Sequence, residues 1–233
     1  MTASRFIDLG SVPPEYGAAA DAVIFDEVSE GRSPATIHVY SRNAATISLG
    51  RFRDPDSDVR RDVAERMGFP SVRRISGGST IFTGTSQIIY SITMEDVFPS
   101  KRDSYSEICT CVASALGSLG IKAEYKQPND VLVNGRKISG SAQYRAKGFL
   151  LQHGTLLTEP EPLIDEVLFS VKDRSYPGTV SISECLGRTV PRDHIVDAIR
   201  KSFIEGLGLD LKSCILSDME RDSISLRSGS FKV

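Results

Sequence analysis

The stretch SVRRISGGSTIFTGTSQIIYSITME, residues 71–95, holds two runs typical of β-strands on either side of a loop that contains glycine. Arg73 and Arg74 stand where the loop begins, and Gly77 and Gly78 follow. Glycine lets the backbone approach a ligand closely, and consecutive N–H groups can bind an anion. Because most Gly-Gly pairs are simply turns, the stretch by itself predicts only strand, loop and strand.

The overall composition narrows the class of protein. The chain has 233 residues, 40% of them hydrophobic and 25% charged, which is ordinary for a globular protein with a buried core. Its net charge of −2 gives no reason to expect nucleic-acid binding. No apolar run reaches membrane-spanning length, and residues 1–5 lead into no signal-peptide core, so we expect a cytoplasmic protein without a membrane segment.

The four cysteines, at positions 109, 111, 185 and 214, lack the spacing of a metal site. Cys109-x-Cys111 is too tight for a usual zinc knuckle, and no paired set of His and Cys follows it. Free cysteine is often part of a protein core. We therefore expect buried, reduced thiols and no structural metal.

The periodicity predicts helices and strands in alternation. In the first half we expect a hairpin formed by residues 35–40 and 45–49, and three helices: residues 16–28, residues 57–68 capped by Ser57, and residues 104–120 with a Ser104/Glu107 capping box. Residues 121–158 read mostly as β, with a hairpin turn at Asn134-Gly135. Helices are expected around residues 162–169 and 192–206, and the final stretch can begin another. The sum is an α+β fold, a mixed and largely antiparallel sheet flanked by helices, in one domain.

Lys137 directly follows the Asn-Gly turn, and the small residues 139–142 come behind it. Small side chains leave room for a flat or large ligand against the strand. An ammonium group fixed there would hold a phosphate against a carboxylate and stabilise charge that develops between them. Asp130, across the turn, would hold this lysine or a magnesium ion. A lone lysine after a turn is as often solvent-facing.

His153-Gly154 forms a third candidate, inside an apolar run. A histidine in such a run is most often a packed core side chain. The alternative is that His153 lines a pocket beside Lys137.

Together these stretches resemble the lipoate–protein ligase family of the biotin/lipoate ligase superfamily, over about residues 18–207. The resemblance rests on six stretches, in order: ATISLG (45–50), RRISGG (73–78), Tyr90-Ser91, Asn129-Asp130, GRKISGSA (135–142) and HGTLL (153–157). It implies the α+β catalytic domain of that superfamily, which is similar to class II synthetases.

The resemblance also implies a two-step reaction. Lipoate and Mg-ATP give lipoyl-AMP, and a lysine of a lipoyl carrier domain then attacks the mixed anhydride to form an amide. The carrier would be a domain of a 2-oxoacid dehydrogenase complex or the glycine cleavage protein. A carboxylate is a poor acyl donor, so adenylation supplies a good leaving group, and holding the reactants in line lowers the barrier further.

Residue by residue, the resemblance makes Lys137 the catalytic lysine that contacts the acyl carbonyl and the phosphate. It implies a lipoate-binding set of Arg74, Ser76, Gly77, Gly78, His153 and Gly154. The implied set for ATP and Mg²⁺ is Arg73, Ser79, Asn129, Asp130, Ser139, Gly140 and Ala142, with Asp130 as an indirect contact to the metal.

The loop departs from the family pattern in three places. Ser79 stands where a third glycine is usual, Thr83-Gly84 replaces a His-Asp pair, and Ser86-Gln87 replaces an asparagine. These changes indicate altered acyl specificity or a lipoyl-binding paralogue that is not catalytic. In length the chain resembles the large half of bipartite ligases. We therefore expect one catalytic domain over residues 1–233, no separate C-terminal accessory domain, and a small accessory subunit needed for adenylation.

Two related enzymes stay as alternatives. An octanoyltransferase would use a cysteine nucleophile, but residues 123–128, where the ligase-like transferases carry it, contain none. Cys185 is then the only thiol in a plausible loop, and its Ser181-x-x-Glu184 capping pattern favours a structural place at a helix start. A biotin ligase would carry a Gly-Arg-Gly-Arg phosphate loop, which is absent.

Overall fold

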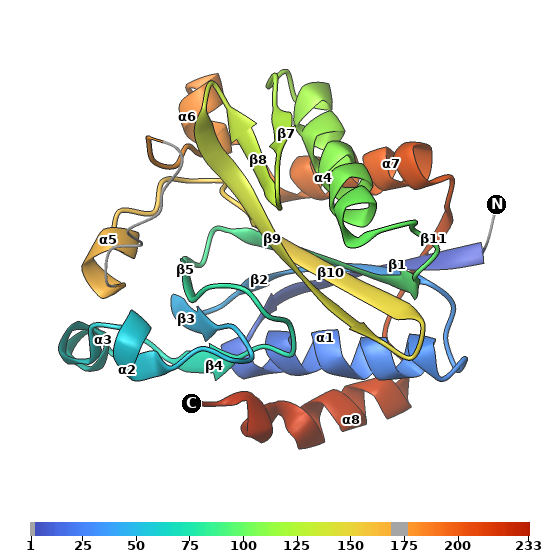
Figure 1. Ribbon diagram of the computed structural model, residues 1–233, viewed down its shortest axis with the longest axis horizontal. Coiled ribbons are helices and arrows are strands. Elements are labelled where there is room, and N and C mark those ends of the chain that lie inside the picture. Colours follow the sequence, from blue (N-terminus) through green and yellow to red (C-terminus); the bar gives the residue numbers. More distant parts are fainter. Residues whose placement is uncertain (1–2, 169–176) are drawn as a thin grey trace.

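A central sheet of eight strands dominates the computed structural model, which describes residues 3–168 and 177–233 (Figure 1). The strand order is β11-β1-β2-β6-β10-β9-β8-β7. β1 pairs in parallel with β11 and β2, and the other neighbours are antiparallel. The expected mixed, largely antiparallel sheet is thus confirmed. Its strands are β1 (Ala3–Val12), β2 (Thr36–Arg42), β6 (Ile88–Glu95), β7 (Glu124–Lys126), β8 (Asp130–Val133), β9 (Arg136–Ala146), β10 (Phe149–Leu156) and β11 (Asp210–Cys214).

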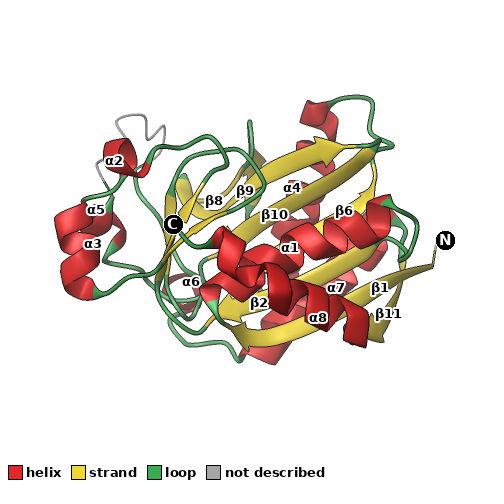
Figure 2. Ribbon diagram, turned by 90° about the horizontal axis from the view of Figure 1, so that it is seen from below, coloured by secondary structure: helices red, strands yellow, loops and turns green. Residues whose placement is uncertain are grey.

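Helices cover both faces of this sheet (Figures 1 and 2). One face carries α1 (Pro14–Ser29) and α8 (Asp218–Ser228), and the other carries α4 (Lys101–Ser118) and α7 (Arg192–Leu207). Successive side chains of a strand point to opposite faces. Ile88, Tyr90 and Ile92 of β6 accordingly pack into the core under α4 and α7, whereas Ile89 faces the other side.

A second, three-stranded sheet lies at one end of the large sheet (Figure 1). Its order is β4-β3-β5, formed by Ser71–Arg73, Thr46–Leu49 and Ile81–Thr83. The short helices α2 (Pro55–Asp58), α3 (Arg61–Met67) and α5 (Ile164–Val167) surround it. The remaining elements are α6 (Ile182–Leu186) and a 3₁₀ turn, η1 (Gly229–Phe231). The stretch quoted first therefore links the small sheet to the large one through β4, β5 and β6.

The hairpin expected from residues 35–49 is wrong. β2 lies in the large sheet and β3 in the small one. The reason is the link between them: the Asn43 N–H donates to the Val12 carbonyl at 2.9 Å, so the chain keeps following β1 after β2 ends. It then enters a different sheet instead of folding back.

Two of the expected helix starts are also wrong. Pro55 begins α2, with Asp54 as its cap, and the helix ends at Asp58, so residues 57–68 form no single helix capped by Ser57. α4 starts a turn earlier than expected because Ser100 caps it. Ser104 lies inside that helix, fully buried, where its hydroxyl accepts hydrogen bonds from other side chains.

Other local predictions are confirmed. Asn134 and Gly135 both have positive φ (49° and 78°) and join β8 to β9, as an Asn-Gly hairpin requires. The capping box at Ser181 and Glu184 starts α6. The helix expected at residues 162–169 is present only as α5, and position 169 lies outside the described residues.

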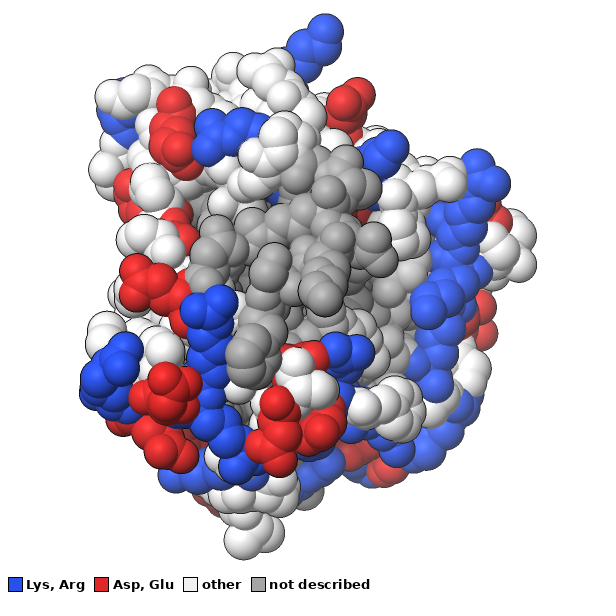
Figure 3. Space-filling model, turned by 60° about the vertical axis from the view of Figure 1, so that its left-hand side comes forward, with Lys and Arg blue, Asp and Glu red and all other residues white. Residues whose placement is uncertain are grey.

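In the described ranges, no helix has the length and apolarity needed to span a bilayer. Figure 3 shows acidic and basic side chains interspersed over much of one face, with a run of basic side chains along its right-hand margin.

Candidate functional site

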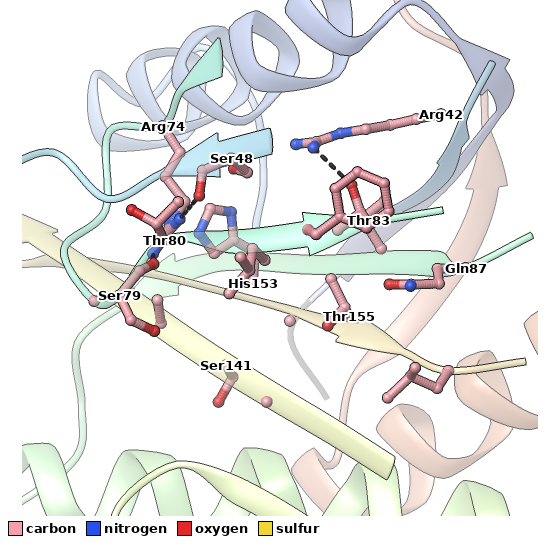
Figure 4. A pocket seen from close by; sticks show the side chains of 18 of the residues that line it. Arg42, Ser48, Arg74, Ser79, Thr80, Thr83, Gln87, Ser141, His153 and Thr155 are labelled. Carbon is pink, nitrogen blue, oxygen red and sulfur yellow. Dashed lines mark hydrogen bonds between the residues drawn. The ribbon is translucent and has the colours of Figure 1, made fainter. Parts of the chain in front are cut away.

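A cavity lies between the two sheets, closed on one side by α1. Four strands of the large sheet supply its floor, where Tyr40, Ile89, Thr155 and Gly140 lie side by side. His153 and Ala142 line the cavity from the next row of paired residues. The small sheet and the loop between β4 and β5 supply the opposite wall, which includes Phe82. Ser48, Ser79 and Thr80 of this wall are shown in Figure 4. Both apolar and polar groups line the walls, which suits a partly apolar ligand that carries polar groups.

Lys137 lines this cavity from the start of β9. Its ammonium Nζ lies 2.6 Å from Asp130 Oδ1, and the two side chains are 23% and 12% exposed. A Cβ added at Gly140 would lie 2.5 Å from both Lys137 Cε and Nζ. Gly140 therefore provides the space in which the ammonium lies, which is the physical reason for a glycine after the lysine.

The loop after β4 is held by Arg74, which is 7% exposed. Its guanidinium donates to the carbonyls of Ser48, Gly77 and Ser79 at 2.7–2.8 Å, and its Nε donates to Ser76 Oγ at 3.0 Å. Burial lowers the pKa of Arg74 to about 10. Because its donors are satisfied by backbone carbonyls, Arg74 shapes the loop that covers the cavity.

A buried hydrogen-bond chain ties this loop to the large sheet and to α1. Ser76 Oγ lies 2.6 Å from His153 Nε2, and His153 Nδ1 lies 2.7 Å from Asp21 Oδ2. The other oxygen of Asp21 lies 2.9 Å from His38 Nε2. Burial alone would raise the pKa of Asp21, but the charges and hydrogen bonds of His153 and His38 outweigh it, so that pKa is lowered. His153 is thus both a packed side chain and part of the cavity wall.

A second hollow adjoins the cavity and shares four residues with it: Gly78, Asn129, Ser141 and Ala142. Its outer walls carry Lys101 and Arg102 together with the rings of Tyr105 and Tyr125. Two cations and two aromatic rings suit an anionic ligand with a flat base.

The structure brings together most of the residues expected at the site. The cavity is lined by Lys137, Arg74, Gly78, Ser79, Asn129, Gly140, Ala142, His153 and Gly154. Gly77 lines the second hollow, and Asp130 reaches the site through its ion pair with Lys137. Ser76 does not line the cavity and contacts it through His153.

Two expected nucleotide contacts lie elsewhere. Arg73 donates to the carbonyls of Gly50, Arg51 and Arg53, away from both hollows, so it stabilises the loop after β3. Ser139 is fully buried on the opposite face of β9, 3.5 Å from the Tyr90 hydroxyl. Alternation along the strand places Ser139 and Gly140 on opposite faces. Lys137 lines the cavity with Gly140, although it stands two residues before Ser139, because the pairing of β8 with β9 shifts its register between Lys137 and Ser139.

The sequence reasoning missed several lining residues. Asp21 lies in α1, and Tyr40 and Arg42 lie in β2, more than ninety residues before Lys137. A signal for Asp21 was present: it is the one acidic residue in the apolar run GAAADAVIF, where burial without a partner would be costly.

None of the cysteines in the described ranges lines the cavity. Cys109 and Cys111 are buried, Cys185 is half-buried and Cys214 is exposed, so the expectation of burial fails for Cys214. Burial raises the pKa of Cys109 to about 11, which disfavours the reactive thiolate.

Comparisons with known proteins agree on one family. The family model described as "Lipoyl protein ligase A/B catalytic domain" matches residues 13–204. Octanoyltransferase LipM of Geobacillus kaustophilus (strain HTA426) is 30% identical, over 93% of this chain and 91% of its own length. The LipM of Bacillus subtilis (strain 168) is 27% identical, over 94% and 92%.

Solved structures confirm the fold. A lipoate-protein ligase A bound with ATP has a TM-score of 0.87 at 18% identity, with 97% of this chain and 94% of that chain covered. The bi-partite lipoate protein ligase of Thermoplasma acidophilum has a TM-score of 0.86 at 19% identity, covering 98% and 93%. The family match spans most of the chain, so this protein belongs to the lipoyl protein ligase A/B catalytic domain family.

Proposed function

We propose that this chain activates a lipoyl-type carboxylic acid with Mg-ATP and transfers the acyl group to a lysine of a lipoyl carrier domain. The observation that carries the proposal is the position of Lys137. Its ammonium lines the cavity between the sheets, next to the residues that this cavity shares with the second hollow. The acid occupies the cavity, the nucleotide occupies the second hollow, and their reacting ends meet there.

In the first step, a carboxylate oxygen attacks the α-phosphorus and the bond to pyrophosphate breaks. Lys137 contacts both the carboxylate and the phosphate and offsets the negative charge that grows between them. Asp130 holds Lys137 in place, and with the nucleotide phosphates it would hold Mg²⁺, which neutralises phosphate charge. Asn129 and Ala142 line both hollows and Gly140 lines the cavity beside Lys137, so these residues lie where the two substrates meet.

In the second step, the carrier lysine amine attacks the acyl carbon, the bond to the AMP oxygen breaks, and the amine loses a proton. Lys137 again contacts the carbonyl oxygen on which charge develops. The loop held by Arg74 covers the acid during both steps and excludes water, which would hydrolyse the mixed anhydride.

A separate small subunit for adenylation is a further part of the proposal. The neighbour from Thermoplasma acidophilum is described as bi-partite and matches this chain over 93% of its length. Formation of acyl-AMP by the purified chain alone, at a rate that no added polypeptide increases, would argue against this part.

A second candidate is octanoyl transfer, favoured by the LipM relatives at 27–30% identity. That chemistry uses a thiol, and the described cavity wall carries none. The experiment that separates the two supplies a lipoyl domain with octanoate plus Mg-ATP in one sample and octanoyl carrier protein without ATP in another. Our proposal predicts a gain in domain mass in the first sample, lost in Lys137→Ala. A gain in the second sample alone would favour transfer.

A further inference from the structure

Arg51 and Phe52 form an exposed pair just outside the loop that covers the cavity, and the proposed reaction gives them no role. Phe52 is 83% exposed. The guanidinium carbon of Arg51 lies 5.5 Å from the centre of the Phe52 ring and 5.7 Å from the centre of the Tyr144 ring. No carboxylate of the described residues pairs with Arg51, whereas the neighbouring Arg53 pairs with Asp58.

The hollow behind this pair is positively charged. The described part of its lining carries one carboxylate, that of Asp26, and four arginines: Arg51, Arg73, Arg74 and Arg227. Asp26 already pairs with Arg227 at 2.7 Å. Arg73 and Arg74 donate to backbone carbonyls of the surrounding loops. The charge of Arg51 is therefore the part of this surface that a binding partner can still neutralise.

The backbone joins Arg51 to the loop that covers the cavity. The Arg51 N–H donates to the Ser76 carbonyl at 2.8 Å. A Cβ added at Gly50 would lie 2.1 Å from the Gly78 carbonyl oxygen, so a glycine at position 50 lets the two loops touch. Whatever binds to Arg51 therefore lies directly beside the covered acid.

The distance from this pair to Lys137 is one that a single protein domain can span. Gly140 lies against the end of the Lys137 side chain, and Tyr144 lies under Arg51. Four residues of a β-strand at about 3.4 Å each separate Gly140 from Tyr144 by about 14 Å. A protein interface of standard size covers about 800 Å² on each partner, which is roughly 30 Å across. A domain whose lysine amine reaches Lys137 therefore also covers Arg51 and Phe52.

We propose that Arg51 and Phe52 are the anchor by which this chain binds the lipoyl carrier domain, through a face of that domain that presents carboxylates beside its acceptor lysine. The inference rests on the proposed function, because it names where the protein substrate of that reaction docks. Arginine and aromatic side chains are enriched among the residues that dominate the binding energy of protein interfaces. A small anion would neutralise Arg51 but leave the Phe52 ring in water, so a protein partner suits the pair better.

The test measures the binding of a fluorescently labelled, unmodified lipoyl domain to the chain by anisotropy. We expect Arg51→Gln and Phe52→Ser each to weaken binding about tenfold. Added salt should weaken binding to the unchanged chain more than binding to Arg51→Gln. The matched controls are Arg66→Gln, at an exposed arginine of α3, and Ile215→Ser, at a side chain that is 80% exposed, and both should keep the original affinity.

A second form of the domain tests the charge pairing itself. In this form the carboxylates nearest the acceptor lysine are changed to amides. It should bind the unchanged chain about tenfold more weakly than the original domain does, and it should bind Arg51→Gln about as well as the original domain does. Equal losses with both chains would overturn the pairing of Arg51 with these carboxylates.

Two further results would overturn the inference: no binding of the domain to the unchanged chain, or equal affinity in the Arg51 and Phe52 variants. Acylation of the domain is measured separately by mass spectrometry. Acylation by a chain whose affinity for the domain does not depend on Arg51 or Phe52 rejects this inference alone. Binding that depends on Arg51, without acylation of the domain, rejects only the proposed function.

Discussion

Gly140→Ala is the sharpest perturbation that the site offers, because it acts on Lys137 without removing it. The new Cβ would lie 2.5 Å from Lys137 Cε and Nζ, whereas ordinary contact begins at 3.4 Å, so the ammonium must move by about 0.9 Å. The atoms that must move are the far end of a flexible side chain, and we expect the fold to be kept. The same Cβ lies 3.2 Å from Asp130 Oδ1, so the ion pair must also adjust.

A displacement of about 1 Å at a reacting centre can cost about 100-fold in rate. We therefore expect Gly140→Ala to slow the acylation of a lipoyl domain about 100-fold, measured by mass spectrometry over time with octanoate or lipoate and Mg-ATP. The melting temperature of the variant should stay close to that of the original chain. Gly117→Ala is the matched control, since a Cβ at Gly117 meets nothing within 4 Å.

An unchanged acylation rate in Gly140→Ala, with Lys137 shown to have moved, would refute the reasoning that the ammonium position controls the reaction. A large loss of stability would instead show that the lysine cannot move, and it would refute our expectation of an intact fold.

Three further predictions concern the surroundings of the site. Gly154→Ala places a Cβ 2.3 Å from the hydroxyl of the fully buried Tyr90. We therefore expect a loss of about 3 kcal/mol in the unfolding free energy, measured by urea titration, and a loss under about 1 kcal/mol would contradict this packing. Asp21 has a lowered pKa, so the stability that it contributes is present above its ordinary value of 3.8 and is lost as pH falls below it. Asp21→Asn should therefore be less stable at pH 7 by about 3 kcal/mol, because His153 loses an ionised partner. On acidification the variant should lose less unfolding free energy than the original chain. Parallel curves of unfolding free energy against pH for the two proteins would count against the pairing. Cys185→Ser should keep its acylation rate within about twofold, and a loss of all transfer would support a thiol intermediate instead.

Local signals in the sequence predicted local structure well. The Asn134-Gly135 turn needs positive φ at both residues, and the Ser181/Glu184 capping box satisfies its own donors, so neither depends on distant parts of the chain. The hairpin expected before residue 50 failed because the partner of Asn43 is Val12, which only the completed sheet brings near.

The same difference between local and long-range signals holds at the site. The positions of Lys137 and Gly140 followed from a turn and a strand. The network of Ser76, His153 and Asp21 joins a loop, β10 and α1, and 132 residues separate the last two of these side chains. Nothing in the spacing of the sequence indicates such a network, and the orientation of Ser139 away from the cavity depends on the register of β9.

The measurement closest to the central claim uses chemically prepared lipoyl-AMP and a lipoyl domain, without ATP and without any second subunit. If the ammonium of Lys137 lies against the acyl carbonyl during transfer, the unchanged chain will lipoylate the domain, and Lys137→Ala will do so at least 100-fold more slowly. Equal rates for the two proteins would contradict the account.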